Sequence, residues 1–137
     1  MSFACFIRFI GRRSCLKLMN RQILVVDDQP GIRMLLSDVF KSKGYQVQTA
    51  NTGAEALEIL SRSSFDLLVI DYQLPIVDGA GVLNELKKRN MQIPTIMISG
   101  LIEELSQETV CMEYVKEIFS KPFNIRDVCS AVQSILS

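Results

Sequence analysis

The sequence predicts an α/β domain in which five parallel strands form one sheet that is covered by helices on both faces. Five short segments, most of them strongly apolar and each bounded by turn residues, are typical of strands in such a sheet. The segments between them carry apolar residues at helical spacing, and the connections are short. Strands that alternate with helices in this way indicate a doubly wound sheet, because each helix returns the chain to begin the next parallel strand.

The strands are predicted from composition and from the residues that end them. The third, at 65–71, is the most apolar and should lie at the centre of the sheet. The second, at 46–50, only alternates weakly between polar and apolar residues, as an edge strand can. In chain order the predicted strands are 23–26, 46–50, 65–71, 94–99 and 117–120.

Helices are predicted between these strands, and local signals mark several of their ends. Residues 31–43 carry one apolar stripe and are followed by Gly44, as a helix C-terminus often is. Thr52 and Glu55 form a capping box for the next helix, and Asn124 can cap the last one. The residues predicted to face the core are Ile32, Leu35, Leu36, Val39 and Phe40; Ala56, Leu57 and Leu60; Val82, Leu83 and Leu86; Ile102, Leu105, Thr109 and Met112; and Val128, Val132, Ile135 and Leu136.

Size, charge and cysteine content narrow the function classes. A chain of 137 residues with 48% hydrophobic residues suits one ordinary domain with a real core. Four of its 15 basic residues lie in the first 18 positions, which contain no acid, so the remainder carries 11 bases against 15 acids. An acidic domain argues against nucleic acid as the main partner. The four cysteines lack metal-site spacing and there is no histidine, which indicates free thiols in a cytoplasmic protein.

Residues 1–18 are interpreted separately from the rest. Arg8 interrupts their apolar run, which is too short to span a membrane and lacks a clear signal-peptide cleavage site. One hypothesis is a basic amphipathic anchor. The preferred hypothesis is an extension that is disordered, dispensable or mis-annotated, with Met19 as the natural start. We therefore expect a domain at 19–137 and no membrane partner.

Polar residues stand where four of the predicted strands end: Asp27 and Asp28, Asp71, Ser99, and Lys121. The carboxyl ends of parallel strands meet at one edge of the sheet, where open α/β sheets keep their sites. Carboxylates suit Mg²⁺, and an aspartate can be a nucleophile that forms an acyl phosphate. A hydroxyl and an amine can contact a phosphoryl group. Each residue alone could be a cap, a turn residue or an exposed lysine, but together they indicate a metal-dependent phosphoryl site.

At this point the chain resembles the receiver domain of bacterial two-component response regulators. The resemblance covers residues 21 to about 136. It implies a flavodoxin-like fold with strand order 2-1-3-4-5. The motifs that carry it are Leu-Val-Val-Asp27-Asp28, Val-Ile-Asp71-Tyr-Gln-Leu-Pro75 with Asp78-Gly79, Ile-Ser99-Gly100, and Ser-Lys121-Pro122-Phe123.

The resemblance also implies a set of roles. Asp71 would be the phosphoacceptor, with Ser99 and Lys121 in contact with the phosphoryl group. Asp27, Asp28, Asp71 and the backbone carbonyl of Gln73 would hold Mg²⁺. The protein would be a monomeric or weakly dimeric signalling phosphoacceptor rather than an enzyme, although it would take part in its own phosphotransfer and autodephosphorylation. Since little chain follows residue 136, we expect no output domain.

Residues 27–36 resemble more closely the stand-alone receiver of the sporulation phosphorelay. By that resemblance, a sensor histidine kinase would supply the phosphoryl group, and a histidine phosphotransferase could receive it. For Leu35, which also matches, the preferred interpretation is a core position. The candidate partner contacts are Gln29, Gly31, Ile32, Leu101, Pro122 and Phe123.

Some positions depart from the receiver pattern. Ile118 stands where receivers usually carry an aromatic residue or a histidine, with Phe119 next to it. Tyr114-Val115 replaces the common Gly-Ala after the fourth helix. These departures leave open whether Ile118 takes the place of the usual aromatic switch.

Other protein classes fit the motifs less well. A phosphatase of the haloacid-dehalogenase type needs an acid where Gln73 stands. A flavodoxin needs a hydroxyl- and glycine-rich phosphate loop, whereas Asp27 and Asp28 would repel the phosphate. The alternative that stays open is a receiver-like binding module that works without phosphorylation.

Overall fold

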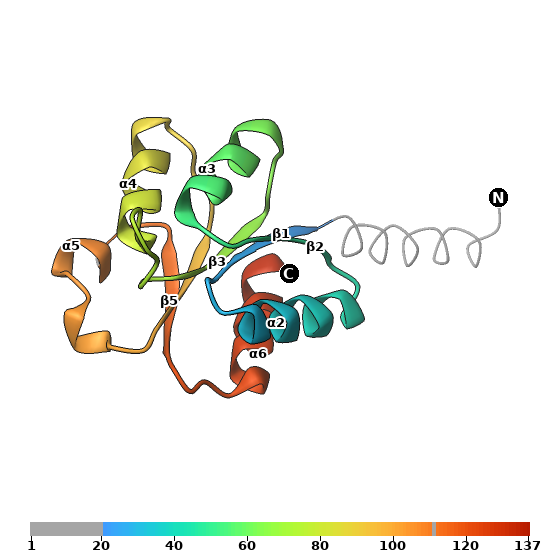
Figure 1. The fold of residues 1–137 in the computed structure, drawn as a ribbon. Coiled ribbons are helices and arrows are strands. Elements are labelled where there is room, and N and C mark those ends of the chain that lie inside the picture. Colours follow the sequence, from blue (N-terminus) through green and yellow to red (C-terminus); the bar gives the residue numbers. More distant parts are fainter. Residues whose placement is uncertain (1–20, 111) are drawn as a thin grey trace, which may run out of the picture.

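In the computed structural model, which describes residues 21–110 and 112–137, five parallel strands form one sheet in the order β2-β1-β3-β4-β5 (Figure 1). This arrangement confirms the predicted strand order. β3 lies at the centre, and Asp71 is its last residue. The strands are β1 (Gln22–Val26), β2 (Gln46–Ala50), β3 (Leu67–Asp71), β4 (Thr95–Ser99) and β5 (Val115–Ser120).

Helices cover both faces of the sheet. α2 (Pro30–Ser42) and α6 (Ile125–Leu136) lie on one face, and α3 (Gly53–Arg62) and α4 (Gly79–Lys88) lie on the other (Figure 1). Successive strand residues point to opposite faces, so each strand contributes to two cores. Leu68 and Ile70 pack with the α3 and α4 side chains, whereas Leu67 and Val69 pack with those of α2 and α6.

The predicted helix ends are found with their capping contacts. Thr52 Oγ1 accepts a hydrogen bond from the backbone N–H of Glu55 at 3.1 Å, and Asn124 Oδ1 accepts one from Arg126 at 2.9 Å. The Glu55 carboxylate accepts from the backbone N–H of Asn51 rather than that of Thr52. Gly44 follows α2 with φ of 98°, a conformation that glycine adopts without steric penalty.

The fourth helix is not the continuous one that the apolar spacing predicted. A 3₁₀ turn, η1 (Ile102–Glu104), and one short helix, α5 (Gln107–Val110), occupy this region, and Ile102 is exposed. Ser106 explains the break, because its hydroxyl accepts from the backbone N–H of Thr109 at 3.1 Å and starts a new helix there. Thr109 is buried as predicted, and Leu105 and Met112 still pack against the core.

The apolar stripe of α2 is narrower than predicted. Leu36 and Phe40 are buried against the sheet, but Leu35 is 44% exposed. The prediction that Leu35 is a core residue is therefore wrong. Successive residues of an α-helix point about 100° apart around its axis. When Leu36 faces the sheet, Leu35 therefore lies at the edge of the interface between α2 and the sheet.

Three sequence-based predictions concern residues outside the described ones. They are the extension at 1–18, the start at Met19, and the free thiols of Cys5, Cys15 and Cys111. Cys129 lies within the described part and is a free, half-buried thiol. Among the described residues, no helix has both the length and the hydropathy to cross a membrane.

Replacing Ile76 with asparagine is expected to raise the free energy of unfolding by about 1 kcal/mol. Ile76, in the loop after β3, has φ of 68°, a region that is strained for a β-branched residue, and its side chain is fully exposed. Asparagine tolerates this conformation, as Asn90 does at φ of 58°. Urea unfolding checks the change, with Asn90→Ile as the reciprocal control that should lose stability. Equal stability of Ile76→Asn and wild type would show that the backbone at Ile76 is not strained.

Candidate functional site

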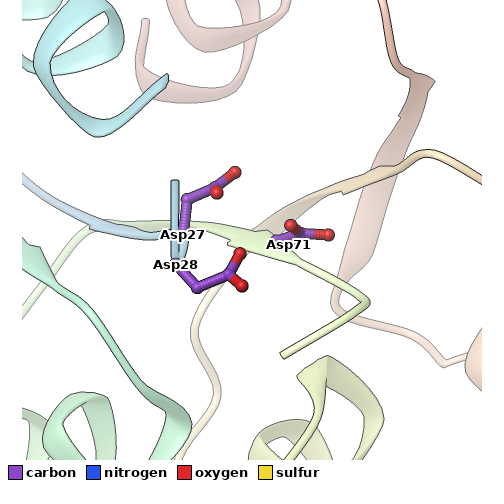
Figure 2. A group of neighbouring side chains, drawn as sticks. All are labelled: Asp27, Asp28 and Asp71. Carbon is purple, nitrogen blue, oxygen red and sulfur yellow. The ribbon is translucent and has the colours of Figure 1, made fainter. Parts of the chain in front are cut away.

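Three aspartates meet where β1 and β3 end. Asp27 and Asp28 directly follow β1, and Asp71 closes β3. One carboxylate oxygen from each lies within 4.8 Å of the others, and Figure 2 shows the three side chains projecting from the two neighbouring strand ends. Asp27 and Asp71 are 1% and 3% exposed, whereas Asp28 is open to solvent. The cluster is thus buried on one side and accessible on the other.

Lys121 reaches this cluster from the end of β5. Its Nζ donates to Asp71 Oδ2 at 2.8 Å, to Asp27 Oδ2 at 3.0 Å and to Gln29 Oε1 at 3.1 Å. Its backbone N–H donates to the carbonyl of Ser99 at 2.8 Å, and the Lys121–Pro122 peptide bond is cis. The ammonium group therefore compensates two carboxylates that would be costly to bury without a partner.

Burial and ion pairing shift the pKa values of Asp27 and Lys121. Burial raises the pKa of Asp27, and the hydrogen bonds from Gln29 and Lys121 only partly oppose it. Burial lowers the pKa of Lys121, but its hydrogen bonds and charge interactions with Asp71 and Asp27 outweigh burial, and the net pKa lies above the usual value. Lys121 is therefore a cation at neutral pH.

The backbone fixes the second oxygen of each buried carboxylate. The backbone N–H of Gln29 donates to Asp27 Oδ1 at 2.8 Å, and that of Gln73 donates to Asp71 Oδ1 at 3.0 Å. Both are local turns in which an aspartate accepts from the residue two positions later. Each buried aspartate is therefore held by the backbone through one oxygen and by Lys121 through the other.

Ser99 lies at the end of β4, beside Asp71 in the sheet. Asp71 pairs with Ile98 in the register of β3 and β4, so Ser99 is one residue beyond this pair. Its side chain is fully buried, and its Oγ accepts from the backbone N–H of Leu101 at 3.1 Å. A Cβ at Gly100 would stand 3.2 Å from Gln73 Oε1, so the Gln73 side chain lies directly over this turn.

The candidate partner contacts differ in accessibility. Gln29, Gly31 and Pro122 are exposed, and Leu101 is 45% exposed. Ile32 and Phe123 are half-buried and pack against the core on the α2 and α6 face. Gln29, Leu101 and Pro122 lie in the loops that follow β1, β4 and β5, and Gly31 lies in the first turn of α2, so all four are at the edge of the sheet that carries the acidic cluster.

Sequence reasoning missed two contacts of this site. It did not predict that the side chain of Gln29 accepts a hydrogen bond from Lys121. It also assigned nothing to Arg33, which donates to the backbone carbonyl of Asp27 at 2.7 Å. The only signal for Arg33 is an unfavourable one, since a cation in the first turn of a helix opposes the helix dipole.

Comparison with known proteins identifies the family. Residues 23–133 match the response regulator receiver domain. The chain belongs to this family. Sporulation initiation phosphotransferase F of Bacillus subtilis (strain 168) is 37% identical over 120 residues, which cover 87% of this chain and 96% of that protein. The alkaline phosphatase synthesis transcriptional regulatory protein PhoP of the same bacterium is 36% identical over 118 residues, but these cover only 49% of its length.

Solved structures of receivers share the fold. The receiver domain of a Francisella response regulator superposes with a TM-score of 0.76 at 28% identity, covering 85% of this chain and 97% of that one. The response regulator protein TrrA of Thermotoga maritima, in complex with Mg(2+)-BeF, superposes with a TM-score of 0.72 at 29% identity. The superposition covers 85% of this chain and 99% of that one. The predicted flavodoxin-like class of this receiver is thereby confirmed.

Proposed function

We propose that this receiver accepts a phosphoryl group from a sensor histidine kinase onto Asp71 in a Mg²⁺-dependent reaction. The observation that carries the proposal is the setting of Asp71. It is buried, it lies among three convergent carboxylates, and its Oδ2 is 2.8 Å from the Lys121 ammonium. A carboxylate held in this way is a positioned nucleophile beside a cation that can pair with an incoming phosphoryl group.

The transfer makes one bond and breaks another. A carboxylate oxygen of Asp71 attacks the phosphorus of a phosphohistidine, the phosphorus–nitrogen bond breaks, and the departing imidazole nitrogen keeps the electron pair and takes up a proton. The product is an acyl phosphate on Asp71. The backbone N–H of Gln73 holds one oxygen of the nucleophile. Lys121 would pair with the phosphoryl charge, and the Ser99 hydroxyl would donate to a phosphoryl oxygen.

The donor set fits Mg²⁺. This ion prefers oxygen ligands and commonly takes one or two carboxylates plus phosphate oxygens and water. Asp27, Asp28 and Asp71 place three carboxylate oxygens within 4.8 Å of one another, and the carbonyl of Gln73 would complete the protein ligands. When bound, Mg²⁺ would offset the repulsion between the carboxylate and the phosphoryl donor. The complex of TrrA with Mg(2+)-BeF, a receiver of similar fold, supports the assignment.

Mg²⁺ is expected to stabilise the folded protein. A ligand that binds only the folded state adds about 2.7 kcal/mol to the free energy of unfolding at 100 times its Kd. Urea unfolding with and without MgCl₂ measures this gain. Asp28→Asn is a suitable control because Asp28 is exposed, so the variant should fold normally but lose most of the gain. An equal gain in this variant would contradict the proposed ligand set.

We further propose that residues 19–137 form a receiver that acts in a sporulation-type relay. The support is the 37% identity to Sporulation initiation phosphotransferase F, of which this chain covers 96%. The exposed residues Gln29, Leu101 and Pro122 would then contact the kinase and a histidine phosphotransferase. We infer a cytoplasmic monomer or weak dimer that also loses its own phosphoryl group by hydrolysis.

Intact-mass analysis after incubation with acetyl phosphate and MgCl₂ tests the phosphoacceptor. We expect one phosphoryl adduct that requires Mg²⁺ and is absent from Asp71→Asn. Its decay rate would then separate a relay component from a switch that resets quickly. Absence of the adduct in folded wild-type protein would contradict the assignment and favour a binding module that works without phosphorylation.

A further inference from the structure

Arg33 joins the loop that carries Asp27 and Asp28 to the start of α3. Its Nη1 donates to the backbone carbonyl of Asp27 at 2.7 Å and to Asn51 Oδ1 at 2.9 Å. Asn51 in turn donates its backbone N–H to the Glu55 carboxylate at 3.0 Å. One guanidinium nitrogen therefore connects the end of β1, the end of β2 and the first turn of α3.

The position of Arg33 is electrostatically unfavourable without these contacts. Its backbone N–H makes an early bond of α2, to the carbonyl of Gln29, so the side chain starts in the first turn of the helix. A cation there opposes the helix dipole, and it also stands near a cluster that would bind another cation. Charge-assisted hydrogen bonds to two oxygens offset this effect.

The contact with the Asp27 carbonyl matters most for Asp28. The Asp27 carbonyl and the Asp28 N–H belong to one planar peptide unit, so holding the carbonyl sets the direction in which Asp28 leaves the strand. Asp27 is additionally held by its own N–H, which donates to Ala50, and by its carboxylate contacts. Within the described part of the chain, the exposed Asp28 carboxylate has no hydrogen bond or ion pair of its own.

We propose that Arg33 is a positioning residue for the Mg²⁺ site: by holding the Asp27–Asp28 peptide unit, it keeps the Asp28 carboxylate close to those of Asp27 and Asp71. This inference rests on the Mg²⁺ role in the proposed function. The direction of the change in Mg²⁺ affinity distinguishes this role from a simple charge effect. Loss of the positive charge alone would strengthen the binding of a cation, whereas loss of positioning weakens it, and we expect positioning to dominate.

Isothermal titration of the metal-free full chain with MgCl₂ tests this role. We expect Arg33→Met to bind Mg²⁺ on the order of tenfold more weakly than wild type, the usual scale for an outer-shell partner. Arg33→Lys keeps the charge but not the planar donor group, and it should also bind more weakly than wild type. Asn51→Ala removes the hydrogen bond between Arg33 and Asn51 but leaves the one between Arg33 and the Asp27 carbonyl, so it should lose less Mg²⁺ affinity than Arg33→Met. This variant also keeps the test available if Arg33→Met does not fold.

Arg126→Met is the matched control. Arg126 lies in the first turn of α6, near the same edge of the sheet, and its side chain has no hydrogen bond or ion pair to the described residues. This variant should bind Mg²⁺ as wild type does, within about twofold. Unfolding curves of every variant show whether the folded state is intact.

The outcomes separate this inference from the proposed function. If folded Arg33→Met or Asn51→Ala binds Mg²⁺ as tightly as wild type or more tightly, the positioning role is overturned and the metal site stands. If the wild type itself does not bind Mg²⁺, the metal role and this inference both fail. Weaker binding by the Arg33 variants together with unchanged binding by Arg126→Met supports positioning, because a charge effect would have the opposite sign.

Discussion

Replacing Lys121 with methionine is expected to lower the free energy of unfolding of the metal-free protein by roughly 3 kcal/mol. Lys121 contacts Asp71 Oδ2 at 2.8 Å and Asp27 Oδ2 at 3.0 Å, and both carboxylates are almost fully buried. Methionine keeps most of the side-chain volume but leaves two negative charges close together without a cation. Part of the loss should be recovered as protonation of a carboxylate at lower pH.

Urea unfolding without metal measures this change, and Lys116→Met is the control. Lys116 lies in β5, the strand that Lys121 directly follows, but it is exposed, and among the described residues its Nζ contacts only the backbone carbonyl of Glu113, at 3.2 Å. Its replacement should change stability by no more than about 0.5 kcal/mol. Mg²⁺ should stabilise Lys121→Met more than wild type, because the ion would supply the missing positive charge. Equal stability of the two methionine variants would show that Lys121 does not compensate the buried carboxylates.

The alternation of strands and helices, most of both cores and most helix ends could be predicted from sequence because they depend on local patterns, whereas the strand order was implied only by the resemblance to receiver domains. The apolar run before Asp71 can only be buried, and its neighbours alternate with amphipathic segments. Thr52 and Asn124 cap the helices that they were predicted to cap. The strand ends could also be predicted to meet, since parallel strands bring their carboxyl ends to one edge.

What the sequence could not predict depends on contacts between distant segments. Leu35 fits the helical spacing as well as Leu36 does, and only the orientation of α2 on the sheet decides which of them is buried. The Ser106 cap competes with an apolar spacing that favours a longer helix, and the local hydrogen bond prevails. The contacts of Gln29 with Lys121 and of Arg33 with Asn51 join residues whose proximity depends on the tertiary fold.

Gly79→Ala is expected to destabilise the protein by about 2 kcal/mol and to slow phosphorylation of Asp71. Alanine at an open helix position is normally favoured over glycine by up to about 1 kcal/mol. At Gly79, however, a Cβ would lie 2.7 Å from the carbonyl oxygen of Asp71 and 2.9 Å from the Cα of Tyr72. Both are backbone atoms, so either α4 must move away from the sheet or the end of β3 must shift.

Gly31→Ala is the matched control, because it makes the same substitution at a helix position with open space. Gly31 lies in the first turn of α2, and a Cβ there would meet nothing within 4 Å, so stability should be unchanged or slightly higher. Urea unfolding and the rate of adduct formation from acetyl phosphate measure both variants. If both the stability and the rate fall in Gly79→Ala, the close approach of α4 to the backbone of Asp71 helps to hold the proposed nucleophile in place. If the Gly79→Ala protein is destabilised but is phosphorylated at the normal rate, the packing of α4 does not determine the position of the Asp71 carboxylate.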